Sequence, residues 1–234
     1  QVEVKGYGLF EGYANRDSLA YRSHYGIDDI PTLKRGTLRK AGYCTAWDAL
    51  VQLGCTDDTY TMELGPKNTW REYIDAFLPH DAIRGTRLNL AYHLNLDPQG
   101  PVMGRLDWLG LFEDTPIGIE GRSPAAMLQH LLEDKWKLGP EDKDLVVMWH
   151  RFRYSVEGVH QELHASLAVC GKDSVHTAMA ATVGLPLAMA PMLVMNGKIP
   201  ERGVLLPLRP NIYDPVLDEL EKHGIVFNEV EVEM

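Results

Sequence analysis

Cysteine is scarce in this sequence. There are three cysteines, Cys44, Cys55 and Cys170, and no two of them are spaced as a Cys-x-x-Cys pair. Cysteines this sparse provide neither a disulfide framework nor paired zinc ligands, so we expect no structural metal. The same scarcity is typical of proteins in a reducing compartment, and we expect a cytoplasmic protein.

Positive charge is also in short supply. The chain has 23 Lys and Arg against 33 Asp and Glu, which gives a net charge of -10. Such a balance argues against nucleic acid and anionic membranes as partners, because both would be repelled. A small anionic ligand is still compatible with it, since a local cluster of cations acts at contact distance.

Motifs for nucleotide binding and nucleophilic catalysis are missing. The stretch GYGLFEG at residues 6–12 has the wrong glycine spacing for a dinucleotide fingerprint and does not join a strand to a helix. The chain has no Walker motif and no nucleophile elbow. No cofactor-binding residue and no catalytic residue can therefore be assigned from motifs.

Long apolar runs are absent, with one exception. Residues 177–195, TAMAATVGLPLAMAPMLVM, carry no charge over 19 positions. That approaches the length of a membrane span, but Pro186 and Pro191, and the lack of a second span, favour a buried helix broken or kinked near the prolines. The N-terminus has neither the apolar core of a signal peptide nor a starting Met, so we expect a piece of a longer protein.

Helical and strand patterns alternate without βαβ regularity, which predicts an α+β fold with a mixed, largely antiparallel sheet flanked by helices. Thr45 and Asp48 predict a capping box that starts a helix, and Ser123 followed by Pro124 predicts another N-terminus. The predicted helices cover 45–53, 68–78, 124–138 and 177–195, with a last one starting at the Asp214-Pro215 pair. The predicted strands are 33–39, the hairpin 144–154 with 159–169, and an edge strand near the C-terminus.

A basic stretch, KRGTLRKAGY at residues 34–43, stands out in this acidic chain. On a strand, Arg35, Thr37 and Arg39 point to one face, and the two arginines lie about 13 Å apart. Two guanidinium forks at that separation can hold two carboxylates of one extended ligand. The alternative from spacing alone is a solvated edge strand whose arginines pair with nearby acids.

Three histidines on the predicted hairpin, His150, His160 and His164, are candidate zinc ligands. His160 and His164 share a face of their strand, while His150 lies on the partner strand. The spacing is not diagnostic, and no carboxylate is clearly placed beside them, so ordinary hairpin histidines are favoured over a metal site and no metal ligand is assigned. One of them could act as an acid or base near a substrate.

Several segments resemble a known family. YANRDSLAYRSHYGI, TLKRGTLRKAGYCTAWDALVQLG, RLDWLGLF, LLEDKWKLGPEDKDLVVMWHRF and TAMAATVGLPLAMAPMLVMNGKI occur in that order along nearly the whole chain. They resemble successive segments of the glutamate-forming saccharopine dehydrogenases. The resemblance implies an enzyme of lysine metabolism that interconverts saccharopine with L-glutamate and α-aminoadipate semialdehyde, using NADP(H).

The resemblance also implies an arrangement. Residues 1–172 would be a substrate-binding α+β domain like the C-terminal domain of glyceraldehyde-3-phosphate dehydrogenase. Residues 173–234 would form a helical return segment and a final strand that pack on a nucleotide-binding domain outside this sequence. NADP(H) would be bound there, the chain alone would be inactive, and a homodimer is expected.

Saccharopine carries three carboxylates, so the resemblance implies that the basic stretch binds the carboxylates of the substrate. We call this set of residues the substrate clamp. Arg39, Arg35 and Thr37 are the main candidate substrate-binding residues, with Asn15 and Arg16 of the NRDS segment added to them. Asp17 would pair with one of the arginines. Asn15 and Arg16 could instead hold their loop through hydrogen bonds to the backbone.

Two departures from the family pattern leave alternatives open. Lys40 replaces the aromatic residue that follows RGTLR in the family, and Cys170 stands where a Tyr precedes glycine. A carboxynorspermidine-type dehydrogenase is therefore an alternative, as is a non-catalytic binding or dimerisation module with the same fold.

Overall fold

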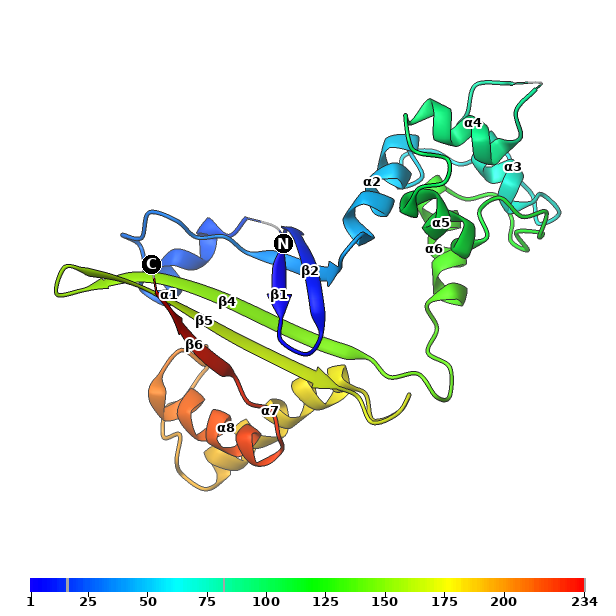
Figure 1. The fold of residues 1–234 in the computed structure, drawn as a ribbon. Coiled ribbons are helices and arrows are strands. Elements are labelled where there is room, and N and C mark those ends of the chain that lie inside the picture. The colour runs from blue at the N-terminus through cyan, green and yellow to red at the C-terminus, as the bar shows by residue number, and fades with distance from the viewer. Residues whose placement is uncertain (16, 82, 234) are drawn as a thin grey trace. The chain divides into compact units, whose positions relative to one another are not determined.

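The computed structural model describes residues 1–15, 17–81 and 83–233. Figure 1 shows its helices and strands, coloured in chain order. The N-terminal half contains β1 (Val2–Val4), β2 (Gly8–Ala14), a 3-10 turn (Leu19–Tyr21), α1 (Arg22–Tyr25), β3 (Gly36–Lys40), α2 (Tyr43–Leu53), α3 (Trp70–Asp75), α4 (Thr86–His93) and α5 (Pro101–Leu109). The C-terminal half contains α6 (Pro124–Lys135), β4 (Leu145–Val156), β5 (Val159–Cys170), α7 (Ala178–Met195), α8 (Pro210–Lys222) and β6 (Asn228–Val232).

The chain forms two compact units. Unit 1 consists mainly of Arg39–Lys137 and also takes in Gln1 and Leu9–Gly12. Unit 2 consists of Val2–Gly8, Tyr13–Leu38 and Leu138–Met234. The domain boundary expected after residue 172 lies inside unit 2, and how residues 173–234 would pack on a further domain stays a prediction.

The predicted α+β class is confirmed. The strands form two three-stranded sheets, in the orders β1-β2-β3 and β4-β5-β6, and helices α2 to α6 make up most of unit 1. The likeness to glyceraldehyde-3-phosphate dehydrogenase stays a prediction.

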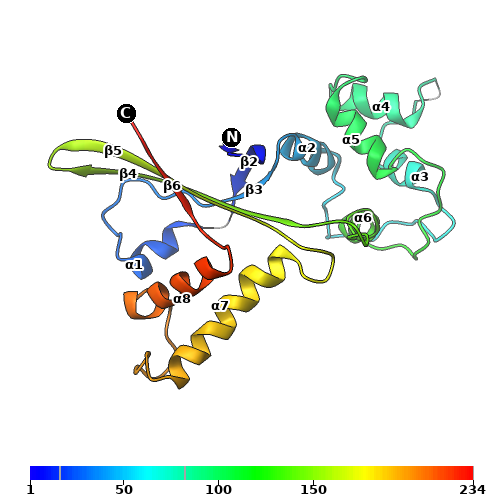
Figure 2. The same cartoon turned by 60° about the horizontal axis from the view of Figure 1, so that its bottom comes forward.

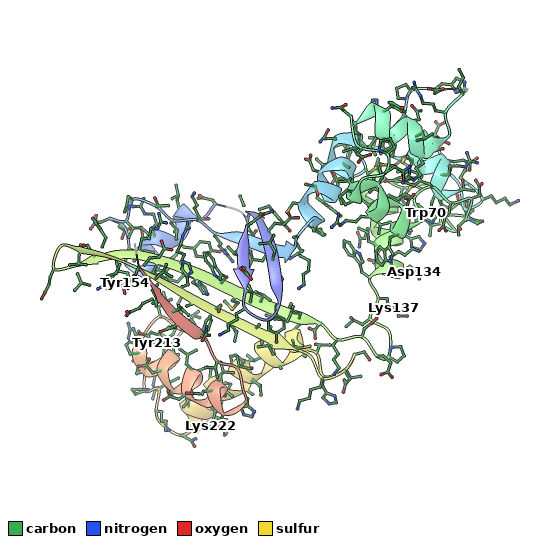
Figure 3. All side chains as sticks on the ribbon, viewed as in Figure 1. Trp70, Asp134, Lys137, Tyr154, Tyr213 and Lys222 are labelled. Carbon is green, nitrogen blue, oxygen red and sulfur yellow. The ribbon has the colours of Figure 1, made fainter. Side chains whose placement is uncertain are left out.

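Helices α2 to α6 enclose the core of unit 1. Its fully buried side chains include Tyr73, Leu90, Met103, Leu106 and Met127. Trp70, labelled in Figure 3, is 6% exposed and packs edge-on against Tyr73. A capping box between Thr69 and Glu72 begins α3, whereas the sequence pattern placed this start near residue 68.

Helix α6 begins where the sequence predicts and ends earlier. The Ser123 hydroxyl accepts a hydrogen bond from the Ala126 N–H at 3.3 Å, and Pro124 occupies the first turn. Met127, Leu128, Leu131 and Leu132 are its buried side chains, as predicted. The helix ends at Lys135 rather than close to Gly139, whose N–H donates to the Asp142 carboxylate at 2.8 Å in a separate turn.

The predicted hairpin is confirmed in unit 2. Strands β4 and β5 pair antiparallel over their whole length, from the Leu145–Cys170 pair to the Val156–Val159 pair. Glu157 and Gly158 form the turn with φ of 51° and 82°, the conformation that matches the twist of antiparallel strands. The predicted C-terminal edge strand is β6, which pairs antiparallel with β5.

The prediction that the helix at 177–195 is buried is wrong, and the helix is not broken at its prolines. Helix α7 is continuous, with Pro186 and Pro191 inside it, and only Ala178 and Met189 are buried. It lies beside α8 and the β4–β5 hairpin (Figure 2), so only part of its apolar surface is covered. Composition alone cannot say where the covering surface comes from, which is why the prediction failed. Among the helices that the structure describes, α7 alone is long and apolar enough to cross a membrane, which for a single helix is weak evidence.

Helix α8 begins earlier than predicted. Its first residue is Pro210, whose fixed φ suits a first helical position, and the predicted start at Asp214-Pro215 lies inside the helix. Pro215 therefore costs one internal hydrogen bond rather than marking the N-terminus.

Candidate functional site

Strand β3 carries the basic stretch that sequence analysis singled out. The strand begins at Gly36, three residues later than predicted, so Arg35 immediately precedes it. Thr37 and Arg39 are alternate residues of β3, and alternate residues of a strand project to the same side. Arg35 and Arg39 are both exposed, and Thr37 is half-buried.

In unit 2, the end of β2 fixes the backbone at Arg35. The Asn15 N–H donates to the Arg35 carbonyl oxygen at 3.1 Å. The Arg35 guanidinium lies 4.7 Å from the centre of the Tyr21 ring, a cation–π contact that orients its donors. Asn15 is half-buried, and its backbone N–H supports the basic stretch directly through this hydrogen bond. Arg16, the other NRDS candidate, lies outside the described residues.

The loop between β2 and α1 is held by local bonds. Asp17 accepts a hydrogen bond from the Leu19 N–H at 2.9 Å and forms no ion pair with an arginine of the described ranges. Its predicted pairing is therefore not found among those arginines. A short acidic side chain in a turn finds a backbone donor more readily than a distant guanidinium. Arg22 donates to the carbonyls of Asp28 and Ile30, the latter at 2.6 Å, and so fixes the chain that leads to β3.

In unit 1, Arg39 faces an acidic residue of β2. The Ala41 N–H donates to the Leu9 carbonyl at 3.3 Å, and this antiparallel register sets Glu11 opposite Arg39. The Arg39 guanidinium lies 5.6 Å from the centre of the Tyr43 ring, in the first turn of α2. Arg39 is thus positioned between an acid on β2 and an aromatic ring on α2.

Glu11 also begins helix α2, and this corrects a prediction. The helix starts at Tyr43 with Gly42 as its N-cap, and no side chain within the helix caps it. The Glu11 carboxylate accepts the Cys44 N–H at 2.5 Å, while Thr45 donates its hydroxyl to the Gly42 carbonyl at 3.1 Å. The predicted Thr45–Asp48 capping box is absent because a strand residue 33 positions away already fills that place.

The pKa of Cys44 depends on the charges around the start of α2. Burial raises the pKa of its thiol, and the negative charge of Glu11 and a hydrogen bond to it raise the pKa further. Arg39 acts in the opposite direction and lowers the pKa of Cys44. The thiol is therefore kept protonated near neutral pH, which does not favour a role as a nucleophile.

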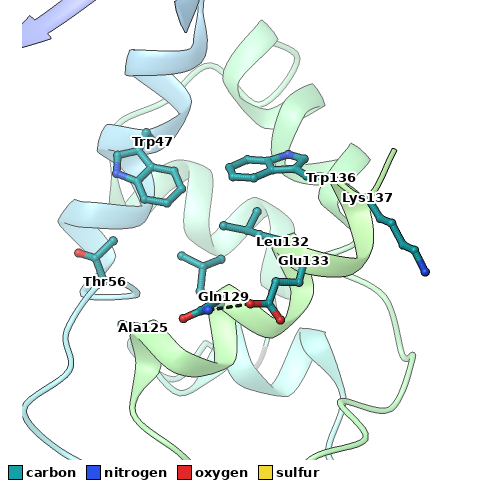
Figure 4. A pocket seen from close by; sticks show the side chains of 9 residues that line it. Trp47, Thr56, Ala125, Gln129, Leu132, Glu133, Trp136 and Lys137 are labelled. Carbon is teal, nitrogen blue, oxygen red and sulfur yellow. Dashed lines mark hydrogen bonds between the residues drawn. The ribbon is translucent and has the colours of Figure 1, made fainter. Parts of the chain in front are cut away.

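An aromatic row continues from Arg39 along unit 1. Tyr43 stacks on Trp47 with ring centres 5.7 Å apart and 9° between their planes, and Trp136 lies 6.4 Å from each of these two rings. Trp47 and Trp136 line an open, mainly apolar cavity of about 570 Å³ between α2 and α6 (Figure 4). Sequence analysis missed this cavity because Trp136 lies far from Trp47 in sequence. The four-residue spacing of Tyr43 and Trp47 was the one available signal.

The three histidines of the hairpin do not form a metal site. The register pairs His150 with Ala165, His164 with Arg151 and His160 with Ser155, so His150 lies on the opposite sheet face from the other two. Within the described ranges no group of three His, Cys, Asp or Glu is placed to hold a metal ion. His150 instead stacks on Phe152, and burial lowers its pKa.

His164 takes part in a cluster of charges. The Glu162 carboxylate, 7% exposed, accepts from the Nε of Arg153 and lies 2.6 Å from the Nε2 of His164. Hydrogen bonds from Arg153 and then His164 lower the pKa of Glu162. Glu162 is therefore an ionised residue held between two basic groups on one sheet face.

Comparison with known proteins finds one family and relatives that agree with it. The family model for the saccharopine dehydrogenase C-terminal domain matches residues 1–225. A mitochondrial alpha-aminoadipic semialdehyde synthase from Mus musculus is 34% identical over 223 residues, which are 93% of this chain and 24% of that protein. A saccharopine dehydrogenase (NADP(+), L-glutamate-forming) from Saccharomyces cerevisiae is 31% identical, over 97% of this chain and 53% of that protein.

A solved structure agrees with these relatives. The apo histidine-tagged saccharopine dehydrogenase (L-Glu forming) from Saccharomyces cerevisiae matches with a TM-score of 0.86 and 30% identity. The match covers 100% of this chain and 54% of that one. The chain thus spans about half the length of the Saccharomyces cerevisiae protein and about a quarter of the Mus musculus one.

Proposed function

Because the chain belongs to the saccharopine dehydrogenase C-terminal domain family, we propose that it is the substrate-binding part of a saccharopine dehydrogenase of lysine metabolism. The enzyme would interconvert saccharopine with L-glutamate and α-aminoadipate semialdehyde. The family match over residues 1–225 is the observation that carries this proposal. The basic stretch around β3 supports it, because a substrate with several carboxylates needs cationic partners.

Within this proposal, Arg39, Arg35 and Thr37 hold the substrate carboxylates. Both guanidinium groups lie over aromatic rings, at 4.7 Å for Arg35 and 5.6 Å for Arg39, and both side chains are exposed. Such stacking orients a guanidinium and leaves its planar donors directed at a carboxylate. Asn15 and Arg16 would complete the substrate-binding set, with Asn15 acting through its bond to the Arg35 backbone.

NADP(H) would be bound outside this chain. A dinucleotide site needs a glycine-rich turn between a parallel strand and a helix. Strands β4, β5 and β6 pair antiparallel, Gly6 lies in the turn between β1 and β2, and Gly8 begins β2. The described residues therefore do not fit the coenzyme, so no hydride-transfer step is assigned to them and the chain alone should be inactive.

Helix α7 is the proposed contact with the nucleotide-binding part. Met179, Leu187 and Met195 on this uncharged helix are 60%, 70% and 85% exposed. Burying such side chains in an interface is worth about 25 cal/mol per Å² of apolar surface. Residues 173–234 would thus form the return segment that packs on the nucleotide-binding part. The whole enzyme is expected to be a cytoplasmic homodimer.

Calorimetric titration of saccharopine into the chain tests the clamp. We expect measurable binding by the natural chain and at least a tenfold loss in the Arg39→Ala variant, since a charge-assisted bond is worth about 1.5–3 kcal/mol. Lys40→Ala is the matched control, because Lys40 is also exposed and is the next residue of β3 but projects to the other side. Equal losses in the two variants would count against a substrate clamp and favour a binding or dimerisation module.

A further inference from the structure

The β4–β5–β6 sheet separates charges of opposite sign between its two faces. The register sets Arg151, Arg153, His160 and His164 on one face, with Glu162 as the one acidic strand residue there. Glu229 and Glu231 of β6 pair with Ala165 and Leu163, and so lie on the opposite face with His150. The first face, named here the basic face, is therefore locally cationic in a chain of net charge -10.

The single acidic residue of the basic face, Glu162, already has two partners. Glu162 is 7% exposed and binds both the Nε of Arg153 and the Nε2 of His164. Its carboxylate thus fixes Arg153 through one nitrogen and neutralises part of the local charge. Within the ranges that the structure describes, the two terminal nitrogens of Arg153 donate no hydrogen bond, and the side chain is 63% exposed.

Two further donor residues lie near Arg153 on the same face. Ser155 is two residues beyond Arg153 on β4, on the same face, and pairs directly with His160 of β5. Directly paired residues have Cβ atoms about 5 Å apart, and neighbours two positions apart on a strand lie about 7 Å apart. A guanidinium, a hydroxyl and an imidazole are therefore neighbours on one face, within an area that one small anion can span.

This area is hollowed. Arg153, Ser155 and His160 of the basic face, together with Tyr154 and Val159 of the opposite face, line an open cavity of about 720 Å³ at the turn end of the hairpin. Tyr154 is labelled in Figure 3 on this end of β4. The backbone here is fixed by the Glu157–Gly158 turn, so the cavity rests on regular paired strands rather than on a loose loop.

We propose that Arg153, Ser155 and His160 form a binding site for a phosphate group at the turn end of the hairpin. The three donors come from three side chains on two strands, and a phosphate group offers more acceptor oxygens to such a set than a carboxylate does. Glu157, in the turn beyond Val156, is the nearby acid that opposes binding, and Glu162 is already bound on both sides. The site is independent of the substrate clamp proposed on β3.

Inorganic phosphate is the probe for this site. Titration into the isotope-labelled chain, followed by NMR at constant ionic strength, should give saturable shifts of the Ser155 and His160 amides and the Arg153 Nε–H. We expect a dissociation constant on the order of 1 mM for an exposed site of this kind. Acetate and L-glutamate, at equal concentration, should shift the same signals less. Tighter binding of either carboxylate would reassign the ligand class.

Variants distinguish a built site, in which specific side chains bind phosphate, from nonspecific electrostatic attraction of phosphate to the basic face. Arg153→Ala should weaken phosphate binding about tenfold or more, while Arg151→Ala, a matched loss of one charge on the same face, should change it less than threefold. Equal losses in these two variants, or shifts that never saturate in the natural chain, would overturn the proposal.

Glu162→Ala, which removes both the charge and the acceptor oxygens, gives the sharpest comparison. It makes the face more positive, so simple attraction predicts tighter phosphate binding, whereas loss of the anchor of Arg153 predicts weaker binding. We expect weaker binding, and tighter binding would show that Arg153 needs no anchor and reject the built site. Unchanged amide dispersion outside the hairpin is the check that each variant is folded.

Discussion

The Glu11 carboxylate on β2 accepts a hydrogen bond at 2.5 Å from the backbone N–H of Cys44, in the first turn of α2. A strand side chain thereby does the work that a Ser, Thr or Asp N-cap does in other helices. The same carboxylate and Arg39 act in opposite directions on the Cys44 thiol.

The first prediction concerns that thiol. Glu11→Gln keeps an acceptor oxygen but removes the charge, so the pKa of Cys44 should fall, while Arg39→Ala should raise it. The pH dependence of the iodoacetamide alkylation rate measures both shifts. Exposed Cys170 must first be changed to Ser, whereas Cys55 is fully buried, which raises its pKa to about 12, and it should stay unreactive.

Glu11→Ala adds a stability readout to this pair. It should lower the pKa of Cys44 and also cost about 1 kcal/mol of unfolding free energy, as the loss of an N-cap does. Shifts of the same sign in the Glu11 and Arg39 variants would contradict the arrangement.

The second prediction concerns the junction between β3 and α2. Gly42 has a φ of 89°, and a Cβ there would overlap the Arg105 guanidinium, which donates to the Ala41 carbonyl at 3.2 Å. Gly42→Ala should therefore lower the unfolding free energy by at least about 1–2 kcal/mol, the cost of the left-handed conformation alone. Urea unfolding measures the loss.

A matched substitution exists in the partner helix. Gly104 lies within α5, and an added Cβ there meets nothing within 4 Å. Gly104→Ala should leave stability unchanged or raise it by up to about 1 kcal/mol, because alanine favours the helix. A loss as large as that of Gly42→Ala would mean that general helix perturbation, and not the junction, sets the cost.

The third prediction concerns how α7 is attached to the hairpin. The Asp144 carboxylate accepts from the N–H groups of Ala178 at 2.6 Å and Met179 at 2.8 Å. Asp144→Ala should cost about 1–2 kcal/mol and speed hydrogen exchange at those two amides, because both lose their acceptor. Exchange in α8 should stay unchanged, and equal acceleration there would indicate general loosening.

Gly171 provides a second way to disturb the same attachment. An added Cβ at this position would overlap the Asp144 carboxylate and lie 3.0 Å from the Ala178 nitrogen. Gly171→Ala should therefore reproduce the exchange pattern of Asp144→Ala without removing a charge. Wild-type exchange rates in Gly171→Ala would argue against this close approach.

The fourth prediction concerns acid unfolding. Hydrogen bonds from Arg153 and His164 lower the pKa of Glu162 in the folded chain. A lowered pKa gives stability that is fully present above the unfolded value, about 4.3, and is lost as the pH falls through the folded value. The unfolding free energy should thus fall more steeply below about pH 4.3 in the natural chain than in Glu162→Gln. Parallel curves would show that this carboxylate does not contribute.

Local patterns in the sequence predicted the regular elements well. The β4–β5 hairpin, the edge strand β6 and the start of α6 at Ser123 are confirmed, because each depends on residues close together in the chain. The start of α2 was wrong because Glu11 lies 33 residues away from Cys44. The burial of α7 was wrong because apolar composition does not reveal whether the covering surface exists in the same chain.

The candidate site was predictable only in part. The basic stretch was found from charge, and β3 carries most of it, but the rings that orient Arg35 and Arg39 come from Tyr21 and Tyr43. The segregation of basic residues onto one sheet face depends on the register between β4, β5 and β6, which pairs residues from distant parts of the chain. Single-sequence patterns give the alternation within a strand but not the partner across it.

The division of the chain into two units has a spectroscopic consequence. Trp47, Trp70, Trp108 and Trp136 belong to unit 1, whereas Trp149 is the one tryptophan of unit 2. Indole fluorescence during denaturation will therefore follow mainly the helical unit, with a contribution from Trp149. Replacing Trp149 with Phe would make the emission a clean reporter of that unit, and keeping Trp149 alone would give a complementary reporter of the hairpin.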